Sequence, residues 1–300
     1  MTAPIMVGLA LRDDDPAPLA LAVELARFMQ APLALVNAFP YDAVTRIPAP
    51  ALERQLRSES LDGLQRVADS LPAEVEVSAH AIAGSSPVRA LHDAAIELDA
   101  ALLVVGSSHR GALQRVMPGG VGERLLHAAP CAIAVAPRGF PGERDGIRRI
   151  GVAFVDTAEG RDALSAAATF AALGEAALVV HCVLEPPHLG PGAATPGWIP
   201  PAPYDARPRL QAAEERVRAH LPDGFEARVV VQEGDPAELL AAASAELDLL
   251  ICGSRGYGPL RTVLLGGVSG RLAHTAACPL VVLPRATDRA LAGALDQPVR

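Results

Sequence analysis

Residues 249–270 read LLICGSRGYGPLRTVLLGGVSG, an apolar run followed by a segment rich in glycine. The apolar run at its start predicts a buried strand, and the residues from about Val268 onward predict a helix. Between them lie glycines at 253, 256, 258, 266 and 267, with another at 270. Glycine weakens helices and strands, so such a cluster indicates either positive φ angles or close approach of another group to the backbone. A phosphate held at the helix start is one explanation, and a tight turn that serves only the chain itself is the other.

An internal repeat sets the domain organisation. When residues 106–138 are placed under residues 253–285 without a gap, 16 of the 33 positions are identical. Self-similarity over this length predicts two domains of one kind. We expect a first domain at 1–138, a linker at 139–147, a second domain at 148–286 and a C-terminal tail at 287–300.

Within each half, short apolar runs alternate with longer stretches of helical spacing. In the first half the pattern predicts strands at 5–11, 33–39, 75–83, 101–105 and 132–136, and helices at 16–29, 51–70, 87–98 and 121–128. In the second half the matching strands begin near residues 150, 177, 227, 249 and 280. Continuous apolar strands separated by helices predict an α/β fold whose parallel sheet is covered on both faces. Ligands of such sheets bind at the carboxyl ends of the strands.

Composition excludes several classes of function. The formal net charge of −8 argues against nucleic acid as a partner, because phosphate backbones require a basic surface. All 26 basic residues are arginine, which excludes the P-loop lysine and Schiff-base chemistry. No apolar run approaches the roughly 20 residues of a membrane span, and the N-terminal residues lack a basic secretion signal. We therefore expect a cytoplasmic protein with no membrane contact.

The other reactive residue types form no recognisable site. The cysteines at 131, 182, 252 and 278 have no CxxC spacing and are expected to be buried thiols, with a redox role for Cys131 and Cys278 as the alternative. His127 and His274 occupy equivalent positions and suit helix C-termini better than a metal, because further ligands are absent. We expect no catalytic residue and no metal site.

The glycine loop of the second half predicts an anion site. Gly266 and Gly267 would let the backbone approach an oxygen-rich ligand, and Ser269 would add a hydroxyl group or a helix cap. Gly253 and Gly256 would form the turn that leaves the strand. Arg255 beside this turn would meet a phosphate or be solvated. In the first half, His109 and Arg110 have the same two interpretations.

The spacing of these glycines resembles the ATP-binding signature of the universal stress protein family. Gly253, Gly256 and Gly266 fit the signature, and the flanking segments ELDLLICGSRG and ACPLVVLPR are similar to those of the family. The resemblance covers nearly the whole chain, twice. It implies two tandem Rossmann-like domains, each doubly wound with a five-stranded parallel sheet. It also implies nucleotide binding in some members, a role in stress survival, and dimerisation or tandem pairing through the last strand.

Some positions depart from the family pattern. Gly267 stands where the ATP-binding form usually has Ser or Thr, and Val155 stands at the acidic position near the nucleoside, with Asp156 one step on. In the first half, His109 replaces the second glycine, Gly120 replaces Ser or Thr, and Ala10 occupies the acidic position. The nucleotide-binding positions carried over are Gly253, Arg255, Gly256, Gly266, Gly267, Val268, Ser269 and Val155, with Gly106, His109, Gly119, Gly120, Val121 and Ala10 in the first half.

The resemblance and the residues together predict a tandem stress protein that binds ATP or a related adenine nucleotide and acts as a sensor or regulator. The two halves should pair within the chain, and the duplication also allows a homodimer. Two alternatives stay open. One is an interaction or scaffold protein whose clefts hold no nucleotide, which the residues at 155 and 267 favour. The other is a slow nucleotide hydrolase, which would need a catalytic constellation that the sequence does not show.

Overall fold

A computed structural model describes most of the chain. The described residues are 3–11, 15–41, 50–107, 116, 120–127, 130–142, 146–187, 204–253 and 267–283. No helix in these ranges is long and apolar enough to cross a membrane.

The described elements alternate between strand and helix in both halves. Those of the first half are β1 Ile5–Gly8, α1 Ala17–Met29, β2 Leu33–Pro40, α2 Pro50–Asp69, β3 Val77–Gly84, α3 Pro87–Glu97, β4 Leu102–Gly106, α4 Gly120–Leu126 and β5 Ala132–Ala136. Those of the second half are β6 Arg149–Phe154, α5 Ala158–Leu173, β7 Ala177–Leu184, α6 Arg207–His220, β8 Ala227–Glu233, α7 Pro236–Ala243, a 3₁₀ turn at Ser244–Glu246, β9 Leu249–Gly253, α8 Gly267–Thr275 and β10 Leu280–Leu283. The α/β fold predicted from the sequence is confirmed.

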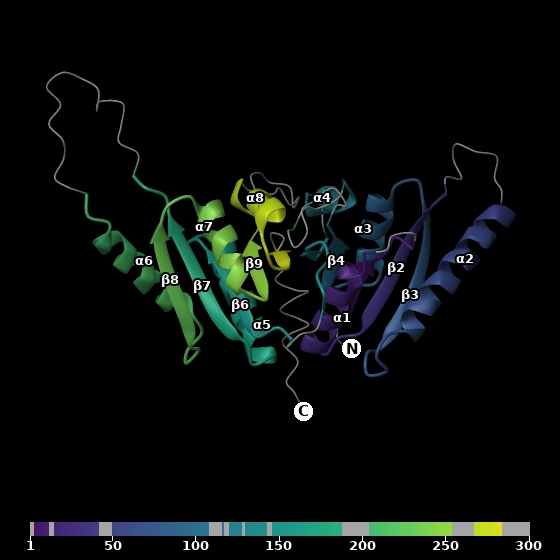
Figure 1. The fold of residues 1–300 in the computed structure, drawn as a ribbon, viewed down its shortest axis with the longest axis horizontal. Helices are drawn as coiled ribbons and strands as arrows, with labels where there is room; N and C mark the ends of the chain where they lie inside the picture. The colour runs from purple at the N-terminus through teal and green to yellow at the C-terminus, as the bar shows by residue number, and fades with distance from the viewer. Residues whose placement is uncertain are drawn as a thin grey trace, which may run out of the picture.

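The described strands form one ten-stranded sheet (Figure 1). Its order is β3-β2-β1-β4-β5-β10-β9-β6-β7-β8, so each half has the doubly wound order 3-2-1-4-5. All pairs within a half are parallel, while β5 and β10 pair antiparallel at the centre, with Leu280 opposite Val135 and Val282 opposite Ile133. The two halves are therefore joined by main-chain hydrogen bonds between their last strands.

Apolar residues cover both faces of the sheet. Along β1, Ile5 and Val7 pack on the face of α1, whereas Met6 packs on the face of α3. The first face carries α1, α2, α5 and α6, and the second carries α3, α4, α7 and α8. Alanine-rich helices such as α5 approach the strands closely because their side chains are short. Burial on both faces explains why the strands are continuous apolar runs rather than alternating ones.

The first strand is shorter than the sequence predicts. It ends at Gly8 instead of residue 11, although the N–H of Leu9 still donates to the carbonyl oxygen of Val36 at 2.8 Å. The Asn37 side-chain amide then donates to the carbonyl oxygen of Leu9 at 2.7 Å. This side chain takes the place of a ladder partner, and the chain turns away from the sheet.

Aromatic packing supports the junction of the halves beneath the sheet. The rings of Phe28 on α1 and Phe170 on α5 stack with centroids 5.8 Å apart. Gly174, which follows α5, lies against Phe28 so closely that a Cβ there would be 1.8 Å from Cε2 of the ring. The contact between α1 and α5 therefore depends on the absence of a side chain at residue 174.

Candidate functional site

A pocket opens at the carboxyl ends of the strands in the second half. It has a volume of about 210 Å³ and is lined by the ends of β6, β7 and β9 and by the first turns of α7 and α8. We call it the edge pocket. A parallel sheet presents its ligand site at this edge, because the helix N-termini also meet there. Of the positions singled out in the sequence, Val155, Gly253, Val268 and Ser269 line it.

The first turn of α8 forms the polar wall of the edge pocket. The helix starts at Gly267, and Ser269 is buried to all but 4% while lining the pocket. A Cβ added at Gly267 would meet no heavy atom within 4 Å. The space beside this glycine is therefore open, and the N–H groups of the helix start can reach an anion there.

The absence of a side chain at Gly253 is explained by packing inside the protein. A Cβ at this position would lie 3.0 Å from the carbonyl oxygen of Glu159, at the start of α5. The equivalent Gly106 lies against Pro18 of α1, where a Cβ would be 2.7 Å from Cγ. Both glycines thus allow a helix to pack on the end of a strand, which is a different role from making space for a ligand. Arg255, Gly256 and Gly266 lie outside the described residues.

The acidic position of the family pattern is occupied by Val155, which is 45% exposed and lines the edge pocket. Its neighbour Asp156 forms ion pairs with Arg161 of α5 at 3.0 Å and with Arg216 of α6 at 3.8 Å, and its carboxylate lies 3.3 Å from Nε2 of His220. Asp156 is absent from the lining of the edge pocket and is held by helices of the opposite face. A shift of one residue therefore does not bring its carboxylate to the site.

Among the described residues, the helix start of the first half lacks the hydroxyl group found in the second. Ala10 is exposed just beyond β1, and Gly120 and Val121 start α4 with no heavy atom within 4 Å of a Cβ built at Gly120. The position of Ser269 is taken by Gly122, which is buried. His109 and Gly119 lie outside the described residues. The first half thus repeats the open helix start of the second half without its hydroxyl group.

His181 is a residue of the edge pocket that the sequence patterns did not single out. It lies in β7, is 9% exposed, and its Nε2 has no hydrogen-bond partner among the described residues. Burial lowers its pKa, the Arg228 guanidinium lowers it further, and the Glu246 carboxylate opposes this. A neutral imidazole is the result near neutral pH. The available signal was a single polar residue within the apolar run ALVVHCVL at 177–184.

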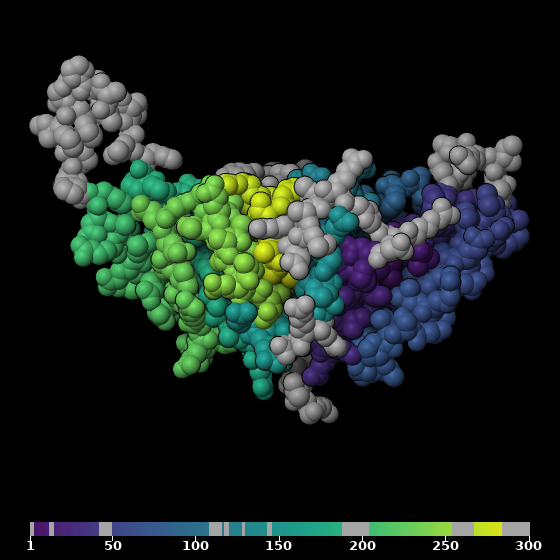
Figure 2. All heavy atoms as spheres, viewed as in Figure 1, coloured from purple at the N-terminus to yellow at the C-terminus, as the bar shows by residue number. Residues whose placement is uncertain are grey.

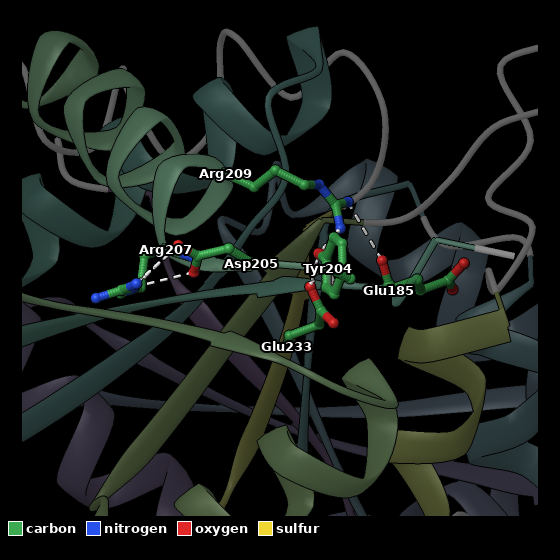
Figure 3. A network of polar contacts seen from close by, with 6 residues as sticks. All are labelled: Glu185, Tyr204, Asp205, Arg207, Arg209 and Glu233. Atoms are coloured by element: carbon green, nitrogen blue, oxygen red, sulfur yellow. Dashed lines mark hydrogen bonds and ion pairs between the residues drawn. The ribbon is translucent and has the colours of Figure 1, made fainter. Parts of the chain in front are cut away.

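A polar network borders the edge pocket at the ends of β7 and β8 (Figure 3). The Tyr204 hydroxyl donates to the Glu233 carboxylate, and Arg209 Nη1 donates to Glu233 at 3.1 Å and to the Tyr204 oxygen at 2.6 Å. Arg209 Nη2 donates to the carbonyl oxygen of Glu185 at 3.3 Å. Because Glu185 lines the pocket, this network ties the start of α6 to the pocket wall.

The four thiols are buried, and the potential metal ligands in the described part of the chain form no cluster. Burial raises the pKa of Cys131, Cys252 and Cys278 to about 12 and also raises that of Cys182. Such thiols stay protonated at neutral pH and pack as small apolar groups. Among the described residues, no three His, Cys, Asp or Glu side chains come together as a metal site would require.

Sequence comparison places this architecture among known proteins. The model of the universal stress protein family matches the chain twice, at residues 1–137 and 146–284. A universal stress protein of Mycobacterium tuberculosis is 27% identical over 295 residues, which cover 93% of this chain and 99% of that protein. A second one from the same organism is 30% identical over 273 residues, covering 84% of this chain and 86% of that protein.

Solved structures show the same fold over the whole chain. The crystal structure of a universal stress protein from Archaeoglobus fulgidus DSM 4304 has a TM-score of 0.69 at 17% identity, and the match covers 95% of this chain and 99% of that one. A putative universal stress protein from Pseudomonas aeruginosa UCBPP-PA14 has a TM-score of 0.61 at 17% identity, covering 98% and 97%.

Proposed function

Because this chain belongs to the universal stress protein family, we propose that its second half binds ATP or a related adenine nucleotide in the edge pocket. The chain would then act as a sensor or regulator in a stress response. The observation that carries this proposal is the start of α8, where open space at Gly267 adjoins the buried Ser269 in the pocket wall.

The phosphates would lie at the first turn of α8. The positive end of the dipole at this helix start favours an anion, and Ser269 contributes a polar side chain to the pocket wall. The nucleoside would lie deeper, against Ala153 and Val183 at the ends of β6 and β7. A pocket of about 210 Å³ suits a nucleoside, so the phosphates would extend outward over the helix start.

We propose that the first half binds nucleotide more weakly. Gly122 stands where the second half has Ser269, and Ala10 offers neither charge nor hydrogen bond at the end of β1. The chain would then carry one strong and one weak site. We also propose that the halves, paired through β5 and β10, work as one unit, with a homodimer as a further level of assembly.

The proposed role is regulatory rather than catalytic. No side chain described at the edge pocket is arranged as a nucleophile with its base, so any hydrolysis of ATP would be slow and incidental to binding.

One observation favours a different function. Val155 replaces an acid, and the carboxylate of Asp156 contacts Arg161, Arg216 and His220 on the opposite face. A protein that has lost this contact could serve as a nucleotide-free scaffold, with its surfaces binding a partner.

Two measurements separate these functions. Mass spectrometry of the denatured protein, purified without added ligand, should release an adenine nucleotide, and calorimetric titration of emptied protein with ATP should give micromolar affinity. A protein that releases no nucleotide and gives no titration signal would be the scaffold instead.

A further inference from the structure

A second hollow lies in the same half, on the outer side of α7. It has a volume of about 340 Å³ and runs between α7 and the strands β7 and β8. We call it the α7 groove. Val179 and Val230 contribute apolar surface from the strands, and Leu239 contributes it from the helix. This volume falls in the range of sites that hold small organic molecules.

Charged groups surround the α7 groove. Arg149 and Arg228 extend from β6 and β8, and Glu246 lies on the 3₁₀ turn after α7. Among the described residues, neither guanidinium group forms a hydrogen bond or ion pair, and neither does the Glu246 carboxylate. Two positive charges and one negative charge leave a net charge of +1. The groove therefore attracts an anionic group.

His181 connects the α7 groove with the edge pocket, because its side chain lines both. A buried polar atom without a partner, such as its Nε2, destabilises the protein unless a ligand or water satisfies it. The imidazole is therefore a polar group available at the inner end of an apolar groove. A ligand with a polar group and an apolar body matches this arrangement.

The first half lacks these features, although its strands have the same register. Leu33 and Leu178 occupy equivalent positions beside Ile5 and Ile150, so His181 corresponds to Val36. Arg228, opposite Val179, corresponds to Ser78, opposite Ala34. His181 and Arg228 are thus peculiar to the second half and are not required by the fold.

We propose that the α7 groove binds a small monocarboxylic acid with an aromatic or branched apolar body. The carboxylate would pair with Arg228 and Arg149, and the body would pack on Val179, Val230 and Leu239. His181 would form the inner end of the site. The linings of this site and of the edge pocket have only His181 in common, and the contacts proposed for the acid do not depend on a bound nucleotide.

The experiment uses four acids as probes: benzoate, phenylacetate, 3-phenylpropionate and isovalerate. Each is titrated into the full-length protein and followed by the histidine ring resonances in NMR, with the matching primary amide as the uncharged control. We expect at least one acid to bind at least tenfold more tightly than its amide and to shift the resonance of His181. That resonance is identified by its absence in His181→Val, which places the valine of the first half at this position.

Variants locate the binding. Arg228→Ser introduces the residue of the first half and should weaken binding of the best acid at least tenfold. Arg89→Ser on α3 removes an arginine whose side chain is 84% exposed, and it should leave the affinity unchanged. Saturating ATP should leave the acid bound, because the edge pocket is a different site.

Several results would overturn the proposal. They are the failure of all four acids to bind, equal affinity for acid and amide, equal effects of Arg228→Ser and Arg89→Ser, or displacement of the acid by ATP. If the acid binds while ATP does not, the proposed acid site in the α7 groove is supported and the proposed nucleotide binding is wrong.

Discussion

The carboxylate of Glu24 on α1 repels that of Asp248 across the junction between the two halves. Glu24 is only 8% exposed, and its Oε2 has no hydrogen-bond partner among the described residues. Asp248 stands just before β9 and accepts the backbone N–H groups of Arg148 and Arg149 at 3.0 and 2.7 Å. Burial makes the larger contribution and this repulsion the smaller one, and together they raise the pKa of Glu24 from 4.5 to about 6.

The shifted pKa predicts a pH dependence of stability. The folded state binds the proton of Glu24 more tightly than the unfolded state, so the protonated group stabilises the fold below pH 4.5 and this stabilisation is lost as the pH rises to about 6. Above pH 6 the charged group costs about 2 kcal/mol. Glu24→Gln should remove this loss and raise the free energy of unfolding at pH 7.5 by up to that amount, as measured by urea denaturation between pH 4.5 and 7.5.

The control for this experiment is Glu97→Gln, which changes an exposed carboxylate at the end of α3. It should leave the pH profile unaltered. A Glu24→Gln protein with the wild-type profile would show that the carboxylate is not buried in solution.

Gly174 is predicted to be essential to the packing of α1 on α5. In Gly174→Ala the new Cβ would overlap the ring of Phe28, which cannot withdraw without losing its stacking on Phe170. We expect a loss of about 1–3 kcal/mol in the free energy of unfolding, as is typical of overpacking. Gly267→Ala is the matched control, because its Cβ enters open space at the first residue of α8 and should change the free energy of unfolding by less than about 0.5 kcal/mol. Thermal denaturation compares the two, and equal melting temperatures would contradict this account of the junction.

Gly267→Glu tests the position of the phosphates. A carboxylate at the start of α8 would occupy the open space and repel a triphosphate, so the affinity for ATP should fall at least tenfold. The fold should stay intact, because a negative charge at a helix N-terminus is favourable. Gly120→Glu makes the same change at the open start of α4 and should leave the strong site unaffected. Calorimetric titration measures both, and an unchanged affinity in Gly267→Glu would place the phosphates elsewhere.

Val155→Asp tests whether the missing acid limits nucleotide binding. The side chain of residue 155 lines the edge pocket and is 45% exposed, so a carboxylate there is solvated and can accept hydrogen bonds from a nucleoside. We expect binding of adenosine, which carries no phosphate, to tighten about tenfold, as one hydrogen bond to a charged group provides. Asp156→Asn should leave adenosine affinity unchanged, because this residue pairs with α5 and α6. If Asp156→Asn changed the affinity for adenosine more than Val155→Asp does, residue 156 rather than residue 155 would be the one beside the nucleoside.

The local pattern of apolar residues along the sequence was sufficient to predict most strands and helices of the fold. The strand predicted at 132–136 was confirmed at both ends, and the helix predicted from about Val268 begins one residue earlier, at Gly267. The first strand was predicted too long, because its end depends on the side chain of Asn37 in a neighbouring strand. Apolar periodicity contains no information about such a partner.

The candidate site could be predicted only in part. The nucleotide-binding positions stay a prediction, and of these positions Ser269 and Val155 line the edge pocket at the carboxyl ends of the strands. The purpose of Gly253 could not be read from its spacing, because it depends on the backbone of Glu159, which packs from α5. Nor could the orientation of Asp156 be predicted, since Arg161, Arg216 and His220 come from two helices of the opposite face.

The sequence by itself determined that the chain is a duplicated α/β protein, because strand and helix periods and the spacing of glycines are local properties of the chain. Pairing through the last strands was implied by the family resemblance, but the antiparallel register of β5 and β10 and the position of His181 near Arg228 and Glu246 came from the tertiary structure. These relationships depend on strand order and register. Register brings together side chains that are remote in sequence, and it is set by the packing of the whole sheet.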